Sequence, residues 1–410
     1  MPFAAVVTLP PSASTCTFAS NPNPQRPLMH PYTPTWETED LKLLRESTAK
    51  FLEREFVPHL KRWFEQGKVD REAWTKAGAM GLLLPGVPEQ YGGGGGSFAH
   101  EAVVIEELEK SGVGANFGYP VHSTICAYYI LHYGTEEQKQ RWLPKLASGE
   151  LVSAIAMSEP GAGSDLQGVQ TRAIRDGDHY VLSGSKTFIS NGQHANHIIV
   201  VAKTSDGKGS RSLSLLVVET DHAPGFKRGR NLEKVGLPAA DTSELFFDQV
   251  RVPVENLLGE EGCGFYHLMA QLPQERLALA TGAVAAIERA VELTTEYTRS
   301  REAFGQRILD FQNTRFTLAE CKTEAHIARV FLDSCIERHL HGELDNVTAS
   351  MAKWWTTQKQ CEIVDACLQL HGGNGYMLDY PIAHMYADAR VQKIYGGSNE
   401  IMKELIGRSL

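Results

Sequence analysis

The chain has 410 residues, 42% of them hydrophobic, and a formal net charge of −9. Because a single hydrophobic core stops growing at roughly 250 to 300 residues, this length predicts a soluble protein of two or three packed units. The negative charge without a long Lys/Arg block argues against nucleic acid as a partner, and no apolar run reaches the roughly 18 residues of a membrane span. Seven scattered cysteines without a CxxC pair predict neither a disulfide framework nor a zinc site and fit a reducing compartment.

Residues 1–36 form the first segment, with eight of the 19 prolines, no acidic residue and a single arginine. This composition predicts an irregular extension. The lack of acids is typical of a mitochondrial transit peptide, but the prolines and the shortage of arginine disfavour the amphipathic helix that such a peptide forms. We therefore expect a bacterial cytoplasm as the location, with the mitochondrial matrix as the alternative.

Residues 37–150 show apolar residues at helical spacing and predict an N-terminal helical domain. The pattern is carried by Leu41, Leu43, Leu44, Phe51, Leu52 and Phe56, and then by Val103, Val104, Ile105 and Leu108. The run Gly92–Gly96 lacks the Lys-Ser/Thr pair of a phosphate loop, so it is interpreted as a flexible connector before a helix at Ser97. Thr135 ahead of two glutamates predicts another helix start.

Residues 151–260 change to short β-branched runs separated by Asp-Gly and Pro-Gly turns, which predicts a middle β-barrel or sandwich. Residues 261–410 return to long helices, expected over Leu277–Arg301, Asn313–His341 and Asp345–His371, as in a helical bundle. The predicted fold class is mainly α with a central β domain. Without βαβ alternation, no Rossmann sheet is expected.

Three glycine-containing segments could bind a ligand. Ala156–Asp165 combines glycines with Ser158 and Ser164, a set suited to a polar ring edge or a phosphate, although a plain turn is the commoner role of such a segment. Lys186–Gly192 places an aromatic and a serine on one strand face, and Gln369–Tyr376 ends a helix with consecutive glycines. Each of them alone is compatible with a purely structural role.

Three other patterns are weak by themselves. Glu275 and Arg276, at the start of the expected Leu277–Arg301 helix, would usually be a solvated pair on a helix surface. His194 and His197 lack a third ligand, so no metal is predicted. No G-x-S-x-G elbow is present, which leaves serine-dependent acyl transfer without support.

Taken together and in this order, the segments resemble the acyl-CoA dehydrogenase family from Thr35 to the C-terminus, and Arg301–Gly305 is a further family hallmark. Leu272–Leu277 together with Tyr395–Gly397 is most similar to the long-chain branch, because Gly396 stands where medium- and short-chain relatives hold their catalytic glutamate. The resemblance implies an N-terminal helical domain, a middle β-barrel, a C-terminal four-helix bundle and a homotetramer that acts in fatty acid β-oxidation.

The resemblance also implies FAD and a set of site residues. The residues expected to bind FAD are Ile155, Met157, Ser158, Gly163, Ser164, Phe188, Ile189, Ser190, Arg301, Phe304, Gln312, Gln369, Leu370, His371, Gly372, Gly373, Ser398, Asn399 and Glu400. The residues expected to face the acyl thioester are Ser164, Tyr266, Pro273, Gln274, Arg276, Gly396 and Gly397. Some of the FAD contacts would cross a subunit interface.

The implied reaction is α,β-dehydrogenation of a medium- to long-chain or branched acyl-CoA to the trans-2-enoyl thioester. Glu275 would remove the α-proton, the β-hydride would pass to flavin N5, and electron-transfer flavoprotein would reoxidise the flavin. Burial by the acyl chain would raise the pKa of Glu275 and so improve it as a base. Backbone donors near the two glycines would stabilise the enolate oxygen.

Other activities share the expected fold. A flavin oxidase or monooxygenase is one alternative, and a dehydrogenase of acyl groups tethered to a carrier protein is another. A flavin-binding protein without enzymatic activity is disfavoured by the presence of Glu275. These alternatives differ in the electron acceptor, in the thioester bearer and in the need for a base.

Overall fold

The computed structural model describes residues 32–205 and 209–410, and Pro34–Leu410 forms one compact unit. The extension predicted for residues 1–36 lies outside the described residues except for its last five. Of these, Trp36 is 6% exposed and its indole N–H donates to Asp333 Oδ1 at 3.1 Å, so the packed part of the chain already includes Trp36. Within the two described ranges, no helix combines the length and apolar character needed to cross a membrane.

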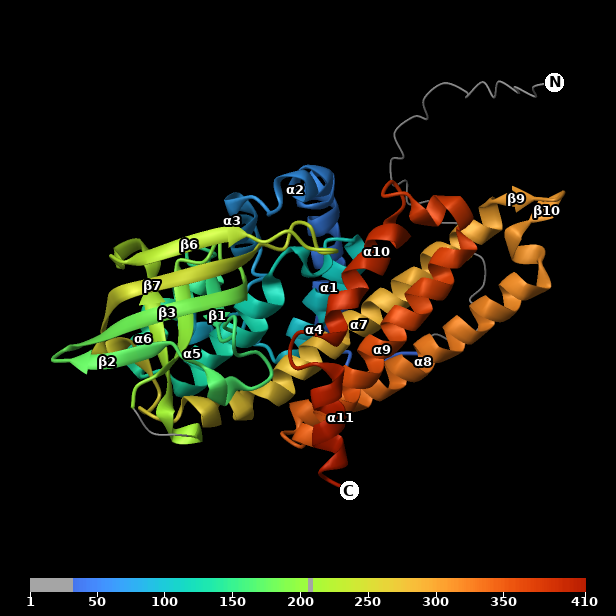
Figure 1. Ribbon diagram of the computed structural model, residues 1–410. Coiled ribbons are helices and arrows are strands. Elements are labelled where there is room, and N and C mark those ends of the chain that lie inside the picture. Colours follow the sequence, from blue (N-terminus) through green and yellow to red (C-terminus); the bar gives the residue numbers. More distant parts are fainter. Residues whose placement is uncertain (1–31, 206–208) are drawn as a thin grey trace, which may run out of the picture. The chain divides into compact units, whose positions relative to one another are not determined.

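The region up to residue 150 is helical, as its apolar spacing predicts (Figure 1). Its elements are α1 (Glu39–Glu55), α2 (Leu60–Gln66), α3 (Arg71–Ala79), α4 (Phe98–Ser111), the π-helical turn η4 (Pro120–Cys126), α5 (Ala127–Tyr133) and α6 (Glu136–Ala147). Both predicted helix starts are confirmed, because the side chain of Ser97 caps α4 and that of Thr135 caps α6. Each accepts a backbone N–H that the first helical turn would otherwise leave without a partner.

The run Gly92–Gly96 differs from its predicted role as a flexible connector. It forms a tight turn in which the Gly94 N–H donates to the Leu84 carbonyl at 3.1 Å. A Cβ added to Gly93 would lie 2.2 Å from the Val87 carbonyl oxygen. Glycine is therefore required here because two stretches of backbone pack directly against each other.

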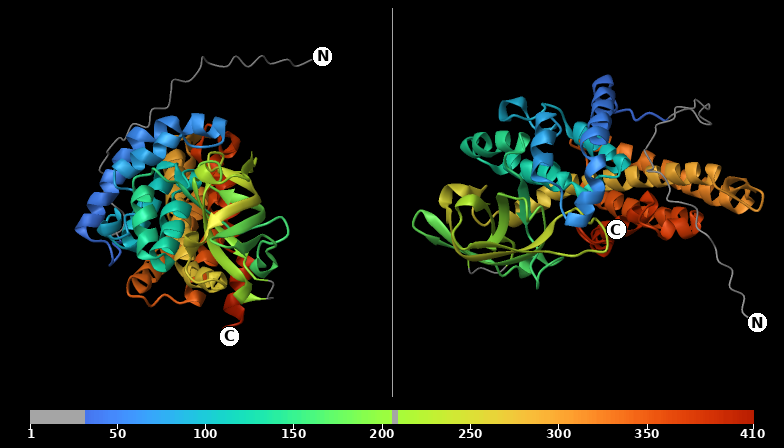
Figure 2. Two further views of the ribbon diagram at one scale, coloured as in Figure 1. Left: turned by 90° about the vertical axis from the view of Figure 1, so that its left-hand side faces the viewer. Right: turned by 90° about the horizontal axis from the view of Figure 1, so that it is seen from above.

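The middle region is a single sheet in the order β6-β7-β3-β2-β4-β5-β8, with β1 paired in parallel to β4. The strands are β1 (Ser153–Ala156), β2 (Arg172–Asp176), β3 (His179–Ser190), β4 (His197–Lys203), β5 (Leu213–Glu219), β6 (Phe226–Asn231), β7 (Thr242–Pro253) and β8 (Leu257–Leu258). In both views of Figure 2, the N-terminal helices, blue to cyan, lie on one side of these strands.

Strand β4 is buried on both faces, which explains its continuous apolar sequence. Ile198 and Val200 belong to a core enclosed by the sheet itself, together with apolar residues of β2, β3, β5 and β7. Ile199 and Val201 point to the opposite face and join the core of the helices. This alternation joins the sheet to the helical part of the unit through continuous apolar contact.

The C-terminal region consists of long helices that lie side by side (Figures 1 and 2). They are α7 (Gly264–Ser300), α8 (Gln312–Leu340), α9 (Asn346–Leu370), α10 (Pro381–Ala389) and α11 (Asn399–Gly407), and a short hairpin of β9 (Glu302–Ala303) and β10 (Gln306–Arg307) joins α7 to α8. The domain boundaries expected after residues 150 and 260 stay predictions.

Helix α7 begins earlier than its sequence indicates. It was expected to start at Leu277, but it starts at Gly264 and runs through Pro273. Proline has no N–H and therefore removes one hydrogen bond from the helix, yet the flanking turns continue on both sides. As a result, Glu275 lies inside a long helix rather than at the start of one.

Candidate active site

Glu275 is a buried carboxyl group on the face of α7 that meets α5. Its side chain is 5% exposed, and Oε1 accepts a hydrogen bond of 2.8 Å from the hydroxyl of Tyr129. Burial raises the pKa of Glu275 to about 7, against the opposing effects of the Tyr129 hydrogen bond and the Arg276 charge. A carboxylate with such a pKa is a stronger base than a solvated one and is still ionised in part at neutral pH.

Tyr129 opposes the effect of burial on the pKa of Glu275. We expect Tyr129→Phe to raise the pKa of Glu275, because the hydroxyl favours the charged form of the carboxyl. The limb of the activity profile that rises with pH should move upward by about one pH unit. The measurement is the initial rate of substrate-dependent dye reduction between pH 5 and about pH 9.

Tyr133→Phe on the same helix is the matched control, since the Tyr133 hydroxyl donates to the His267 carbonyl instead. Identical profiles for both variants would argue against the assignment of Tyr129.

The neighbours of Glu275 on α7 have their side chains engaged elsewhere. The guanidinium of Arg276 donates to Asn346 Oδ1 at 2.7 Å and to Ser350 Oγ at 3.1 Å, both on α9. The amide of Gln274 donates to the Thr124 carbonyl of η4 at 2.9 Å. These two predicted substrate-binding residues therefore use their side chains to fix α7, and contact with a substrate would come from their backbone.

Two other predicted substrate residues lie towards the start of α7. Pro273 is half-buried, two residues before the base. Tyr266 is 49% exposed and lies nine residues, or about 13.5 Å along the helix axis, from Glu275. Tyr266 is thus placed to contact a part of a ligand that is remote from the reacting carbons.

Gly396, the first residue of the glycine pair Gly396–Gly397, lies against Leu279 of α7, and Gly397 lies against Met402 of α11. Both residues have left-handed backbones, with φ of 63° and 91°. A Cβ added to Gly396 would lie 2.2 Å from Cδ1 of Leu279, which stands one helical turn after Glu275. The structure therefore places Gly396, which is far from Glu275 in sequence, beside the helical turn of α7 that follows the predicted base.

A β-bulge aligns the two segments that were predicted to hold the flavin ring. The register of β3 against β7 shifts between Lys186 and Ile189, and the free N–H of Thr187 donates to the Ser158 carbonyl at 3.0 Å. Phe188 within the bulge has φ of 60° and is 68% exposed. Bulges of this kind redirect a side chain away from the sheet, and here Phe188 is directed outward beside the serine loop.

A buried ion pair holds the serine loop in place. Lys186 Nζ donates to Glu159 Oε1 at 2.9 Å and to the Met157 carbonyl at 3.0 Å. Burial lowers the pKa of Lys186 to about 8, and the Glu159 carboxylate partly offsets that effect. The backbone of Met157 and Ser158 is thereby fixed against β3.

The remaining predicted residues of this region differ in exposure. Ile155 is half-buried on β1, opposite Ile199 of β4, whereas Ile189 is 2% exposed and packs inside the sheet's own core. Ser190 is half-buried, and Gly163 and Ser164 are exposed. Of this group, Ile189 is the residue whose side chain points away from the loop, so it would reach a cofactor through its backbone.

A second cluster forms where α7 and α9 end. A pocket of about 390 Å³ is lined by Tyr297, Arg301, Ala303, Ile308, Leu370, His371, Gly372, Gly373 and Asn374. Arg301 and the segment 370–373, all predicted to bind FAD, thus share one cavity. Phe304, Gln312 and Gln369 are exposed and do not line it, and Phe304 is 96% exposed.

The last three predicted FAD residues stand at the start of α11. The Ser398 hydroxyl caps the helix by accepting the Ile401 N–H. Asn399 is 2% exposed and its Oδ1 accepts a hydrogen bond from Lys353, whereas Glu400 is exposed. The side chain of Asn399 therefore holds this segment to α9.

The two histidines considered for a metal have separate structural partners. His194 Nε2 is 3.0 Å from the Val69 carbonyl, and His197 Nδ1 is 2.9 Å from Ser153 Oγ. In the described part of the chain, no three His, Cys, Asp or Glu side chains are grouped to hold a metal ion.

Comparison with known proteins identifies the family. The chain matches the models of the acyl-CoA dehydrogenase N-terminal domain over residues 38–150, the middle domain over 154–250 and the C-terminal domain over 262–410. The long-chain specific acyl-CoA dehydrogenase, mitochondrial, of Sus scrofa is 48% identical over 90% of this chain and 86% of that protein. This chain belongs to the acyl-CoA dehydrogenase family.

Solved structures agree with this placement. An acyl-CoA dehydrogenase from Geobacillus kaustophilus is 49% identical, has a TM-score of 0.89, and the match covers 92% of this chain and 99% of that one. A glutaryl-CoA dehydrogenase from Mycobacterium smegmatis, in complex with FADH2, is 28% identical with a TM-score of 0.85, and the match covers 91% and 95% of the chains. Since the relatives include a mitochondrial and a bacterial protein, the compartment stays a prediction.

Enzymes of this family are FAD-dependent oxidoreductases that act on CH–CH bonds, and the residues present here fit that cofactor. An added Cβ at Gly161 or Gly163 would meet nothing within 4 Å, so the backbone of the serine loop is accessible. The bulge presents Phe188 beside it, as a flat apolar ligand requires. The Arg301 pocket offers a cation and glycine backbone, which suit a phosphate.

Sequence reasoning missed Tyr129, Lys186 in its structural role, and Lys353. Tyr129 is 146 residues from its partner Glu275, and no local pattern connects the two. Lys353 is 0% exposed in the middle of α9. Its position in a row of polar residues at helical spacing was the available signal.

Proposed function

We propose that this protein dehydrogenates a medium- to long-chain or branched acyl-CoA to the trans-2-enoyl-CoA, with Glu275 as the proton acceptor. The observation that supports this most is the position of Glu275, a buried carboxyl with a pKa raised to about 7, on the α7 face that contacts Gly396. A solvated surface glutamate, the commoner role for such a residue, would be exposed and would not have this pKa.

The proposed chemistry assigns one task to each part of the site. Glu275 takes the α-proton of the thioester, and backbone N–H groups of Gly396–Gly397 stabilise the charge that develops on the thioester oxygen. The β-carbon loses its hydrogen with the bonding pair while the α,β double bond forms. Bound FAD supplies the two-electron acceptor. The serine loop and Phe188 orient the ring system, and α5 with η4 keeps water from Glu275.

The electron acceptor separates this proposal from its alternatives. The purified protein should be yellow, be bleached without oxygen by long-chain acyl-CoAs, and pass electrons to electron-transfer flavoprotein far faster than to oxygen. A panel of acyl-CoAs of graded length, followed by absorbance, gives the preferred chain. Rapid stoichiometric peroxide formation would indicate an oxidase. Bleaching by acyl groups bound to a carrier protein, but not by acyl-CoAs, would indicate a tethered substrate.

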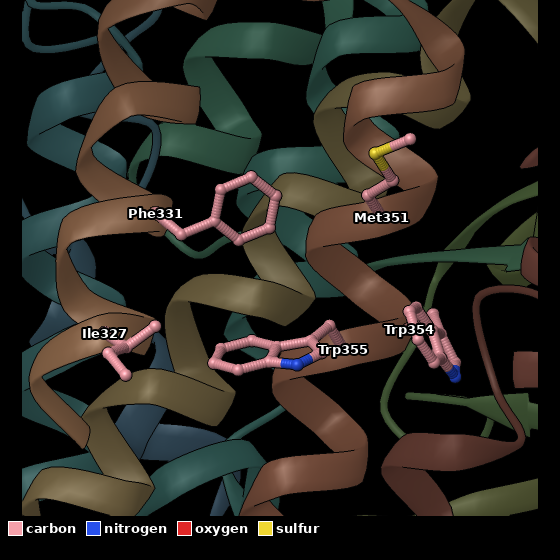
Figure 3. Close-up of a pocket in the computed structure, with 5 residues that line it drawn as sticks. All are labelled: Ile327, Phe331, Met351, Trp354 and Trp355. Atoms are coloured by element: carbon pink, nitrogen blue, oxygen red, sulfur yellow. The ribbon is translucent and has the colours of Figure 1, made fainter. Parts of the chain in front are cut away.

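We also propose a homotetramer, supported by an apolar surface between α8 and α9. A hollow of about 280 Å³ there is lined by Ile327 and Phe331 from α8 and by Met351, Trp354 and Trp355 from α9 (Figure 3). Ile327 is 49% exposed and Met351 is 37% exposed, more apolar surface than a helix face in water usually carries. A second copy of the chain would cover it.

The proposed tetramer can be tested by placing one charged side chain in the apolar hollow between α8 and α9. Ile327→Glu should shift the protein from tetramer to smaller species in light scattering, because an unpartnered carboxylate inside an apolar interface costs several kcal/mol. Lys322→Glu on the exposed surface of α8 is the control for added negative charge. An unchanged tetramer for Ile327→Glu would place the interface elsewhere.

A further inference from the structure

Helix α9 carries a row of polar residues that begins at the exposed Asn346 and continues into the inside of the protein. Asn346, Ser350, Lys353 and Thr357 are spaced by four, three and four residues, which places them on one face of the helix. Ser350, Lys353 and Thr357 are each 0% exposed. Asn346 and Ser350 hold Arg276, the residue after the proposed base, whereas Lys353 and Thr357 hold the start of α11. The row therefore connects the two sides of the proposed active site.

Lys353 makes the contacts that matter most for the glycine pair. Its ammonium group donates to the Gly397 carbonyl at 2.7 Å and to Asn399 Oδ1 at 3.1 Å. Within residues 32–205 and 209–410 it has no carboxylate at ion-pair distance, and the charges that influence it are Arg276 and the exposed Glu400. Burial, assisted by Arg276, lowers the pKa of Lys353 to about 7.

A buried ammonium without a carboxylate partner is costly, and an apolar side chain of the same length would pack there at lower cost. Its two acceptors both belong to the segment that carries the glycine pair. Gly396 and Gly397 have no side chains of their own to restrict the left-handed backbone conformations that they adopt. The geometric effect of Lys353 is therefore to fix the orientation of the peptide unit that follows Gly397.

We propose that Lys353 is a positioning residue for the dehydrogenation: by holding the Gly397 carbonyl, it restricts rotation of the Gly397 backbone, and this restriction keeps the preceding N–H groups of Gly396–Gly397 directed at the developing enolate oxygen. This inference rests on the proposed function. Lys353 does not touch the substrate in this scheme, and it exchanges no proton with it. Its contribution is the orientation of a donor, which is worth most when the donor is pre-organised.

The first test is kinetic. Lys353→Met keeps the length of the side chain and removes its donors, so anaerobic flavin reduction by a saturating long-chain acyl-CoA should slow by about 10- to 100-fold. Binding of the trans-2-enoyl-CoA product, which needs no developing charge, should change by less than about threefold. Thr357→Val removes the 3.2 Å bond to Asn399 and the hydroxyl's bonds to the Lys353 and Trp354 carbonyls of its own helix, but leaves the Lys353 ammonium contacts in place. It is the matched control, with a rate near that of the unmodified protein.

The second test needs no turnover. A bound 3-ketoacyl-CoA ionises to its enolate, whose ultraviolet absorbance can be titrated against pH. Lys353→Met should raise the pH of half-ionisation by about one to two units, which corresponds to the same 10- to 100-fold loss of enolate stabilisation. The titration is read against Glu275→Gln in parallel, so that ionisation of the base is not mistaken for that of the ligand.

The outcomes separate this inference from the proposed function. Unchanged reduction and unchanged ionisation in folded, FAD-containing Lys353→Met would overturn the role of Lys353 alone. If that variant does not fold, Lys353→Gln decides, because its neutral amide is one bond shorter and reaches the Gly397 carbonyl less well: a rate and ionisation like those of the unmodified protein would overturn the proposal, and values between those of the unmodified protein and the expected loss support it. Failure of every acyl-CoA to bleach the unmodified protein would instead contradict the proposed function.

Discussion

Glu275→Gln is expected to slow anaerobic flavin reduction by acyl-CoA by roughly 10²- to 10⁴-fold while FAD content and folding stay unchanged. The amide keeps the size of the side chain and can still accept the hydrogen bond of Tyr129, but it cannot take a proton. Stopped-flow absorbance after mixing with substrate measures the rate. The unmodified protein should lose activity as pH falls through about 7, because the ionised form of Glu275 is the base. The Gln variant should not show this limb.

Glu101 provides a matched control for this experiment. It is also fully buried, its pKa is likewise raised to about 7 by burial, and it also accepts a hydrogen bond from a tyrosine, Tyr119, at 2.5 Å. Glu101→Gln should therefore reproduce any general effect of neutralising a buried carboxyl while leaving reduction within a few-fold of the unmodified rate. If both variants reduce equally fast, Glu275 is not the base.

A second experiment moves the carboxylate to position 396 in the variant that lacks the base. Gly396 lies on the α7 face of Glu275, so Gly396→Glu in the Glu275→Gln background should restore part of the rate. A side chain there meets Cδ1 of Leu279 and strains a backbone with φ of 63°, which is why Leu279→Ala should be included. Recovery of about tenfold or more would show that both positions reach the same α-hydrogen.

Arg329→Leu is expected to lower the free energy of unfolding by about 3 to 5 kcal/mol, because it removes a buried cation shared by Glu106, Asp333 and Glu288 and leaves Arg45 as the remaining partner of Glu106. Arg329 is 8% exposed and donates to Glu106 Oε1 at 2.6 Å and to Glu288 Oε2 at 2.8 Å. These bonds join α8 to α4 and α7. Denaturant unfolding of the FAD-bound protein, followed by circular dichroism, measures the change. Arg408→Leu breaks the exposed pair with Glu404 and should cost no more than about 1 kcal/mol.

The pKa of Glu106 determines how the stabilisation by Arg329 depends on pH. Burial alone would raise the pKa of Glu106, but the charges of Arg329 and Arg45 outweigh it and hold the value at about 2. A depressed folded-state pKa stabilises the protein fully above the usual range near 4.5 and loses this effect as pH falls towards 2. Arg329→Leu should therefore lose most stability near neutral pH and differ least from the unmodified protein in strong acid. An equal difference at all pH values would contradict the ion-pair explanation.

The long helices and their order could be predicted because their signals are local. Helices α8 and α9 were expected over Asn313–His341 and Asp345–His371, and both agree with the structure to within one residue at each end. Helix α7 was predicted too short because Pro273 interrupts its hydrogen bonding, and the chain pattern does not show that flanking turns can compensate. The glycine run was misjudged for a similar reason, since its packing partner is another stretch of backbone.

Some residues of the candidate site could be predicted from the sequence, and others could not. Glu275 and the glycine pair came from family resemblance, and the fold brings Gly396 beside the turn of α7 that follows Glu275. Tyr129 has no signal in its own surroundings, and the polar row that contains Lys353 does not show which residues Lys353 binds, because a buried hydrogen bond depends on which distant segment packs opposite. Their importance follows from burial and partner geometry, which only the folded chain defines.

The Lys186–Glu159 pair and the Arg301 pocket differ in how dissolved ions reach them. The side chains of Lys186 and Glu159 are 0% and 6% exposed, so mobile ions screen this pair little, whereas Arg301 is exposed to solvent. At physiological ionic strength the screening length is about 8 Å, and it shortens as salt is added. If the Arg301 pocket and the serine loop hold the nucleotide and ring ends of FAD as predicted, added salt would weaken the nucleotide contacts first and spare the contacts to the ring.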